Sequence, residues 1–240
     1  MLILRGWKPW TMTSTAIISY DDTLNDQDAL ALGRVLREAG AELILAYVRH
    51  TTRSEPDREE LEEHDAEALL ERGARWLDDL DVDRRIVVHA STGEGLAALA
   101  DETGARLIVF GSDYRTAAGH VAPQMSAQRL LEGGRCGVAI APAGYGAARE
   151  HRIGTIGLLA SLDDHAAIDT AHALASRFGA SVTDTTAGVD LLIVGSRPEA
   201  AEGQVLVSSR AWNAIEEATA PVLVVARGVP AAFIAPLPVS

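Results

Sequence analysis

The sequence predicts an α/β protein with a doubly wound parallel sheet, on the basis of two observations. First, short apolar segments with strand character alternate with amphipathic helical segments over residues 16–141, which favours parallel strands covered by helices on both faces. Second, residues 107–112 recur as residues 191–196, at an offset of 84 and without a gap. A repeat of this kind indicates duplication of one folding unit. We therefore expect one complete five-stranded unit and a second copy of it.

Strands and helices alternate strictly in the first unit. The first helix ends at Gly40, a good residue to stop a helix, and the second is long and acidic and begins near Pro56, which suits a first turn. The expected strands are residues 16–20, 42–48, 85–89, 107–110 and 137–141. The other helices are expected at residues 26–39, 95–102 and 126–132. Right-handed crossovers make this pattern doubly wound, with the ligand site at the carboxyl ends of the strands.

The second unit is shorter than the first. Gly40 and Gly104 are 64 positions apart, whereas the matching Gly179 and Gly188 are 9 apart, so 55 residues are missing. About three strands (residues 156–160, 191–194 and 220–224) and two helices remain, the first of them at residues 166–178. Such a fragment buries too little surface to fold alone. We expect it to pack on the first unit about a pseudo-two-fold axis through the repeated final strands, as a pseudo-dimer.

The division of the chain follows from these units. We expect an N-terminal arm (residues 1–14), a complete domain (15–145), a truncated domain (151–228) and a C-terminal tail (229–240). Because the truncated copy leaves its outer strand without a neighbour, we expect the arm, the tail or a second chain to cover that edge.

Composition excludes several classes of protein. The net charge of −13 argues against binding to nucleic acid, which needs a basic face. The N-terminus lacks the apolar stretch of a secretion signal, and the apolar C-terminal 20 residues hold four prolines, so a membrane span is not expected. We expect a cytoplasmic protein.

The first unit opens with a strand and Asp21, followed by Ala29-Leu30 and then by Gly40-Ala41-Glu42-Leu43. This opening resembles the first strand, Asp and helix of a known family, the universal stress proteins, in a tandem form. The later segment is similar to its Gly-x2-Gly-x9-Gly-Ser/Thr loop. The resemblance covers residues 15–228 and implies the adenine-nucleotide α-hydrolase-like fold, which binds ATP in some members and not in others.

The glycine loop is incomplete in both copies. After Gly111, Tyr114 occupies the second glycine position, Gln124 the third and Met125 the hydroxyl position, with Ser126 one residue later. After Gly195, Pro198 and Ser208-Ser209 occupy these positions. Glycines let backbone N–H groups approach phosphates, a side chain at such a position is strained, and proline removes a donor. Both loops have therefore lost features needed to bind a triphosphate.

The nucleoside part of the family's site is retained in the first copy. The resemblance implies that Asp21 lies near the ribose and Val48 near the adenine edge. In the second copy we equate Asp21 with Leu159, so the carboxylate is lost there. The alternative for Asp21 is a helix-entry carboxylate beside Asp22 and Thr23. The candidate nucleotide-binding residues are Tyr20, Asp21, Asp22, Val48, Gly111, Ser112, Gln124, Met125 and Ser126.

Two functions remain open. We expect a stress-response regulatory or scaffold protein that contacts an unidentified protein partner or a second copy of itself, with a degenerate nucleotide site and no cofactor. The alternative is an adenine-nucleotide sensor that binds ATP or AMP, with or without Mg²⁺, in the first domain, and hydrolyses ATP slowly at most. No catalytic set is expected. The one helix face with metal-ligand spacing (His165, Asp169 and His172) is interpreted as a solvated surface, so no metal site is expected either.

Overall fold

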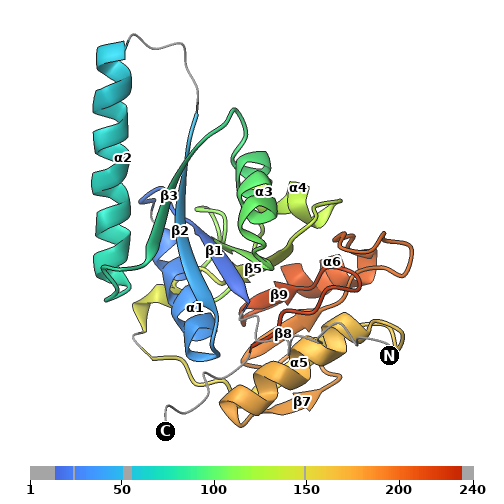
Figure 1. Ribbon diagram of the computed structural model, residues 1–240. Helices are drawn as coiled ribbons and strands as arrows, with labels where there is room; N and C mark the ends of the chain where they lie inside the picture. Colours follow the sequence, from blue (N-terminus) through green and yellow to red (C-terminus); the bar gives the residue numbers. More distant parts are fainter. Residues whose placement is uncertain (1–13, 24, 51–55, 149, 234–240) are drawn as a thin grey trace, which may run out of the picture.

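The computed structural model describes residues 14–23, 25–50, 56–148 and 150–233 (Figure 1). These residues form an α/β fold around one nine-stranded sheet with the order β3-β2-β1-β4-β5-β9-β8-β6-β7. The strands are β1 (Thr15–Ser19), β2 (Glu42–Arg49), β3 (Asp83–Val88), β4 (Leu107–Gly111), β5 (Gly137–Ala141), β6 (Thr155–Leu159), β7 (Ser181–Thr183), β8 (Leu191–Val194) and β9 (Val222–Val224). The helices are α1 (Asp26–Glu38), α2 (Pro56–Trp76), α3 (Thr92–Thr103), α4 (Met125–Leu131), α5 (His165–Phe178) and α6 (Ser209–Glu216), with a 3₁₀ turn, η1 (Tyr145–Ala147).

We call β1–β5 with α1–α4 the first half. Its strands are all parallel, in the order β3-β2-β1-β4-β5. The chain moves outward from β1 to β2 and β3, then crosses back to β4 on the other side of β1, so the direction of winding reverses between β1 and β4. In sheets of this kind a ligand binds at the carboxyl ends of the strands beside that reversal.

The expected elements of the first half are confirmed, with shifts at some ends. Helix α3 begins three residues earlier than predicted because Ser91 caps it, its hydroxyl oxygen accepting the amide of Glu94 at 3.5 Å. Helix α4 begins one residue earlier, at Met125. Each helix is preceded by an N-cap residue with extended backbone, Ser91 for α3 and Gln124 for α4. The spacing of apolar residues, on which the prediction rested, does not identify such N-cap residues.

The sheet does not stop at the five strands predicted for the first unit. Strand β5 pairs antiparallel with β9, and the pairing is centred on Ala139 opposite Leu223. Val138 lies opposite Val224 and Ile140 opposite Val222. Ala139 and Leu223 are 84 positions apart, the offset of the sequence repeat.

We call β6–β9 with α5 and α6 the second half. Its strands are parallel to one another, in the order β9-β8-β6-β7. The prediction of about three strands was one short, because Ser181–Thr183 pairs with β6 as β7. This segment has only three residues, too few for a periodic pattern.

Helices cover both faces of the sheet. One core lies under α1, α2 and α5 and the other under α3, α4 and α6, as the buried residues of these helices divide between two clusters. The second half has no counterpart of α3, and the loop after β7 covers part of that face instead. At Gly157 of β6, a Cβ would lie 2.5 Å from the carbonyl oxygen of Thr185 in this loop.

The described part of the tail does not cover the edge of β7. It crosses α5, where the amide of Ala231 donates to the hydroxyl of Thr170 at 3.0 Å, and the carbonyl of Ala232 accepts the amide of Ser14 at the start of β1, also at 3.0 Å. Residues 1–13 and 234–240, to which the prediction of a covered edge also refers, lie outside the described residues.

Candidate functional site

The candidate site is the edge of the sheet at the carboxyl ends of β1 and β4. Asp21 lies two residues beyond β1, exposed to solvent, and its backbone amide donates to Oδ2 of Asp26 at 2.6 Å. The amide of Thr23 donates to the same oxygen at 3.1 Å and to Oδ1 of Asp21 at 3.2 Å. Burial, and next the neighbouring Asp21 carboxylate, raises the pKa of Asp26 to about 7. The loop is thus closed around Asp26, the first residue of α1.

Tyr20 and Asp22 form a second set of contacts that points towards α2. The Tyr20 hydroxyl donates to Asp22 at 2.8 Å, and Arg72 of α2 forms an ion pair with the same carboxylate at 2.8 Å. The hydrogen bond from Tyr20 is the largest effect on the pKa of Asp22 and lowers it; burial opposes this, and the hydrogen bond and charge of Arg72 lower the pKa further. Asp22 has a φ of 61°, an uncommon backbone for a residue with a side chain, and these contacts compensate for it. Both residues therefore hold the loop to α2.

Gly111 is packed against the backbone of the first helix cap. Asn25, the residue before α1, lies so close that a Cβ on Gly111 would be 2.1 Å from its carbonyl oxygen. The Asn25 side chain does not cap α1; it donates to the carbonyl oxygens of Ser112 and Asp113 at 2.8 and 3.0 Å. Any side chain at position 111 would therefore collide with Asn25.

Ser112 is buried, and its hydroxyl is used inside the protein. It donates to the carbonyl of Ala141 at 2.7 Å and accepts the amide of Ala122 at 3.1 Å. The loop that follows folds back on itself, with a bridge between Ser112 and Pro123. Seven backbone amides of residues 113–122 donate to protein acceptors, namely those of Asp113, Arg115, Thr116, Gly119, His120, Val121 and Ala122.

The remaining loop candidates lie at the start of α4. Gln124 is its N-cap residue and its side chain makes no capping hydrogen bond. Met125 is 68% exposed, and Arg129 approaches its sulfur at 4.0 Å. Ser126 packs against α3, where a Cβ on Gly93 would lie 3.2 Å from its carbonyl oxygen. The starts of α3 and α4 therefore meet at this edge of the sheet.

The structure does not bring all candidates together. Val48 is buried under α3, close to Gly95, whereas Tyr20 is buried under α2, close to Gly73, and the two belong to different cores. Tyr20 and Val48 thus lie on opposite faces of the sheet. Asp21, Gly111 and Ser112 do share one edge with the start of α4.

Sequence reasoning missed residues at this edge. Asn25 and Asp26 hold the two loops together, and an Asn-Asp pair before a helical pattern is a capping signal that identifies such positions. His50 follows β2, and its Nε2 lies 3.3 Å from the hydroxyl oxygen of Thr92 at the start of α3. No sequence signal linked these two residues, because they meet only through the pairing of the sheet.

The second half repeats this local geometry at its own strand ends. The Ser196 hydroxyl donates to the carbonyl of Val225 at 2.7 Å, and the corresponding pair of the first half, Ser112 and Ala141, is 84 positions earlier. Gly195 abuts Asp164, the N-cap of α5, as Gly111 abuts Asn25. The equation of Asp21 with Leu159 was wrong, because Leu158 pairs with Ile193 as Ile18 pairs with Val109. This register makes Leu159 the counterpart of Ser19 and places Ser161 opposite Asp21.

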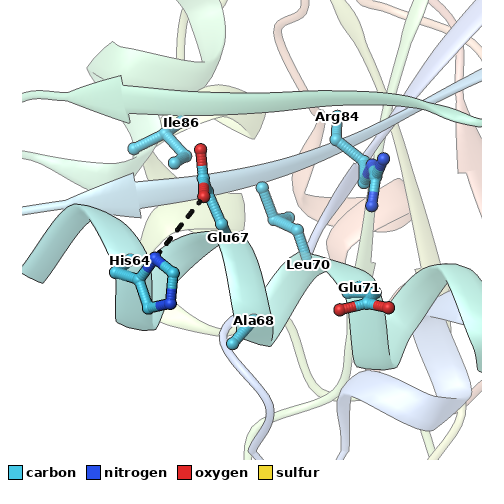
Figure 2. A pocket seen from close by; sticks show the side chains of 7 residues that line it. All are labelled: His64, Glu67, Ala68, Leu70, Glu71, Arg84 and Ile86. Atoms are coloured by element: carbon cyan, nitrogen blue, oxygen red, sulfur yellow. Dashed lines mark ion pairs between the residues drawn. The ribbon is translucent and has the colours of Figure 1, made fainter.

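Two cavities lie away from the candidate residues. One, of 530 Å³, lies between α2 and β3, where Figure 2 shows His64, Glu67 and Leu70 of α2 beside Arg84 and Ile86 of β3. The other, of 320 Å³, lies between the two halves, with Leu131 and Glu132 on one side and Trp212 on the other. In the part of the chain that the structure describes, no cluster of three or more His, Cys, Asp or Glu side chains is placed to hold a metal ion. Nor is any described helix long and apolar enough to cross a membrane.

The fold is that of a doubly wound α/β protein in which the strand order reverses between β1 and β4. The model of the universal stress protein family matches residues 12–142, and the chain belongs to this family. No curated protein is a significant match to the sequence.

Solved structures share the fold over most of the chain. A universal stress protein from Archaeoglobus fulgidus DSM 4304 superposes with a TM-score of 0.65 at 12% identity, covering 89% of this chain and 98% of that one. A protein from Pseudomonas aeruginosa UCBPP-PA14 superposes with a TM-score of 0.57 at 14% identity, covering 90% and 93%.

Proposed function

We propose that this protein is a stress-response regulatory or scaffold protein of the cytoplasm, built as a tandem universal stress protein with a truncated second copy. It acts through contacts with a protein partner or a second copy of the chain, and its nucleotide site is degenerate. The observation that carries the proposal is the internal use of the first loop. A phosphate site of this fold needs free backbone amides, and seven amides of residues 113–122 already donate to protein acceptors.

The pseudo-dimer rests on reciprocal contacts between the halves. The amide of Val121 in the first half donates to the carbonyl of Ala218 in the second, at 3.1 Å. The amide of Val205 in the second half donates to the carbonyl of Gly134 in the first, at 2.7 Å. The two donors, Val121 and Val205, are 84 positions apart, and so are the two acceptors, Gly134 and Ala218. A two-fold axis produces reciprocal contacts of this kind, because it exchanges the two halves. These bonds support descent of the chain from a symmetric homodimer.

A nucleotide sensor is the second candidate, and one observation favours it. Asp21 is exposed at the reversal between β1 and β4, so a ribose can reach its carboxylate. Adenosine or AMP needs fewer phosphate contacts than ATP, and it fits a site in which only the nucleoside part is retained.

A thermal-shift series separates the two candidates. The protein is heated with ATP, ADP, AMP or adenosine, with and without Mg²⁺. A ligand at 100 times its Kd adds about 2.7 kcal/mol of stability, which raises the Tm of a chain of this size by roughly 5–10 °C. We expect no shift with ATP. An ATP shift that disappears in Asp21→Ala but persists in Asp65→Ala, a matched change on the exposed face of α2, would overturn the scaffold proposal.

A further inference from the structure

A charged cluster lies at the strand ends of the second half, in the place where this fold binds ligands. Asp164 follows β6 and Arg227 follows β9, on either side of Gly195 at the end of β8. Arg227 Nη2 lies 2.7 Å from Oδ2 of Asp163, and Arg227 Nη1 lies 3.9 Å from Oδ1 of Asp164. The guanidinium of Arg227 thus bridges two carboxylates at the carboxyl ends of three neighbouring parallel strands.

Most of this cluster is shielded from water. The side chain of Asp164 is 0% exposed and that of Arg227 is 19% exposed, while Asp163 on the outside is 61% exposed. A buried carboxylate without a cation is strongly unfavourable, and burial raises the pKa of Asp164. The amide of Ala167, which donates to Oδ1 at 3.4 Å, and the charge of Arg227 both oppose that rise. Three buried polar atoms of the cluster have no hydrogen-bond partner among the described residues, namely Asp164 Oδ2, Arg227 Nη1 and Ser161 Oγ. Arg227 and Asp164 therefore attract each other by charge without a hydrogen bond between them.

The first half has neutral residues at the same two positions. Asn25 corresponds to Asp164, because each precedes the first helix of its half and abuts the glycine after the central strand. Ala143 corresponds to Arg227 at the offset of 84. The second half therefore differs by one added anion and one added cation that touch each other. Two changes of opposite charge at adjoining positions are what an internal ion pair requires.

We propose that Arg227 is an internal guanidinium ligand of the strand ends of the second half. Its side chain, held by Asp163 and Asp164, takes the place that an external ligand would have at the carboxyl ends of these strands. It also holds the exit of β9, and with it the start of the tail, to the loop between β6 and α5. The correspondence with Asn25 and Ala143 rests on the pseudo-dimer proposed above, whereas the contacts of Arg227 do not.

Chemical rescue tests the proposal directly. In Arg227→Ala the guanidinium is removed and Asp164 remains buried, so we expect the Tm to fall by roughly 6–12 °C. Ethylguanidinium at millimolar concentration fits the space that is left and should restore at least half of that fall, whereas ethylammonium at the same concentration should not. Arg210→Ala, which removes an exposed arginine of the same half, is the control, with no change in Tm and no rescue. An unchanged Tm in Arg227→Ala, or equal rescue by both cations, would overturn the proposal.

A second variant covers the case in which Arg227→Ala does not fold. The double variant Asp164→Asn with Arg227→Ala copies the neutral pair of the first half. We expect it to fold with a Tm within about 4 °C of the wild type and to ignore ethylguanidinium, since the buried charge is gone. A double variant as unstable as Arg227→Ala alone would refute the ion-pair explanation. These measurements contain no nucleotide, so their failure is separate from a failure of the proposed function.

Discussion

The backbone amide of Asp21 donates to Oδ2 of Asp26 across 2.6 Å, and Asp26 is only 6% exposed. Burial and the Asp21 carboxylate raise the pKa of Asp26 to about 7, well above the value of about 3.9 in an unfolded chain. The folded state therefore binds the proton more tightly than the unfolded state. The stability of the loop that carries Asp21 is consequently sensitive to pH.

The first prediction follows from the sign of this shift. Protonated Asp26 contributes its full stabilisation of the folded state below about pH 4, and this stabilisation is lost as pH rises to about 7. The free energy of unfolding falls by on the order of 3 kcal/mol over that window. Asp26→Asn keeps an oxygen acceptor for the two amides and removes the titration. We expect the free energy of unfolding, from urea titrations between pH 4 and 8, to fall less with pH in this variant. Asp65→Asn on exposed α2 is the control, and equal pH profiles for Asp26→Asn and the wild type would contradict the assignment.

The second prediction concerns the paired hydroxyls of Ser112 and Ser196. Ser112→Ala removes a donor to Ala141 and an acceptor for the amide of Ala122, whereas Ser196→Ala removes the hydrogen bond to Val225. We expect losses in the free energy of unfolding of about 2 kcal/mol for Ser112→Ala and about 1 kcal/mol for Ser196→Ala. Exposed Ser176→Ala should have no effect. A larger loss at Ser196 would show that the two hydroxyls are not used as described.

Much of the fold was predictable because apolar segments of five to eight residues with glycine boundaries mark most strands, and the 84-residue repeat linked β4 and β5 to β8 and β9. The use of each site residue was less accessible. Whether Ser112 faces a ligand or the carbonyl of Ala141 depends on β5, which is 25 residues further along the chain. The equation of Asp21 with Leu159 failed because strand ends are not marked in the sequence, and a shift of two residues exchanges a strand residue for a loop residue.

The third prediction tests whether position 111 is a glycine because of packing or because of phosphate binding. A Cβ there would lie 2.1 Å from the backbone carbonyl of Asn25, which has no flexible side chain to move aside. Gly111→Ala should therefore lower the free energy of unfolding by roughly 2–3 kcal/mol in the absence of any nucleotide. Gly154→Ala is the matched control, because its nearest neighbour would be the Asp190 side chain at 3.5 Å, an ordinary contact. If Gly111→Ala is as stable as the control, the glycine is not required by Asn25.

The last prediction concerns the junction between the halves. Strand β5 meets β9 about a centre at Ala139 and Leu223, and Val222 and Val224 of β9 take the positions that Val138 and Ile140 of a second β5 would fill. A chain ending at Ala148 exposes the edge of β5, with five buried residues, to solvent. We expect this chain to pair with itself through β5, Ala139 opposite Ala139 of the other copy, and to elute as a homodimer with the light-scattering mass of two chains. Replacing Ile140 by proline in the same chain removes a donor from that edge, because the N–H groups of Val138 and Ile140 face β9, and should shift the mass towards one chain. A folded monomer of the unsubstituted half would mean that the symmetry of the junction does not reflect an ancestral dimer, and that the second half is needed for a reason other than covering β5.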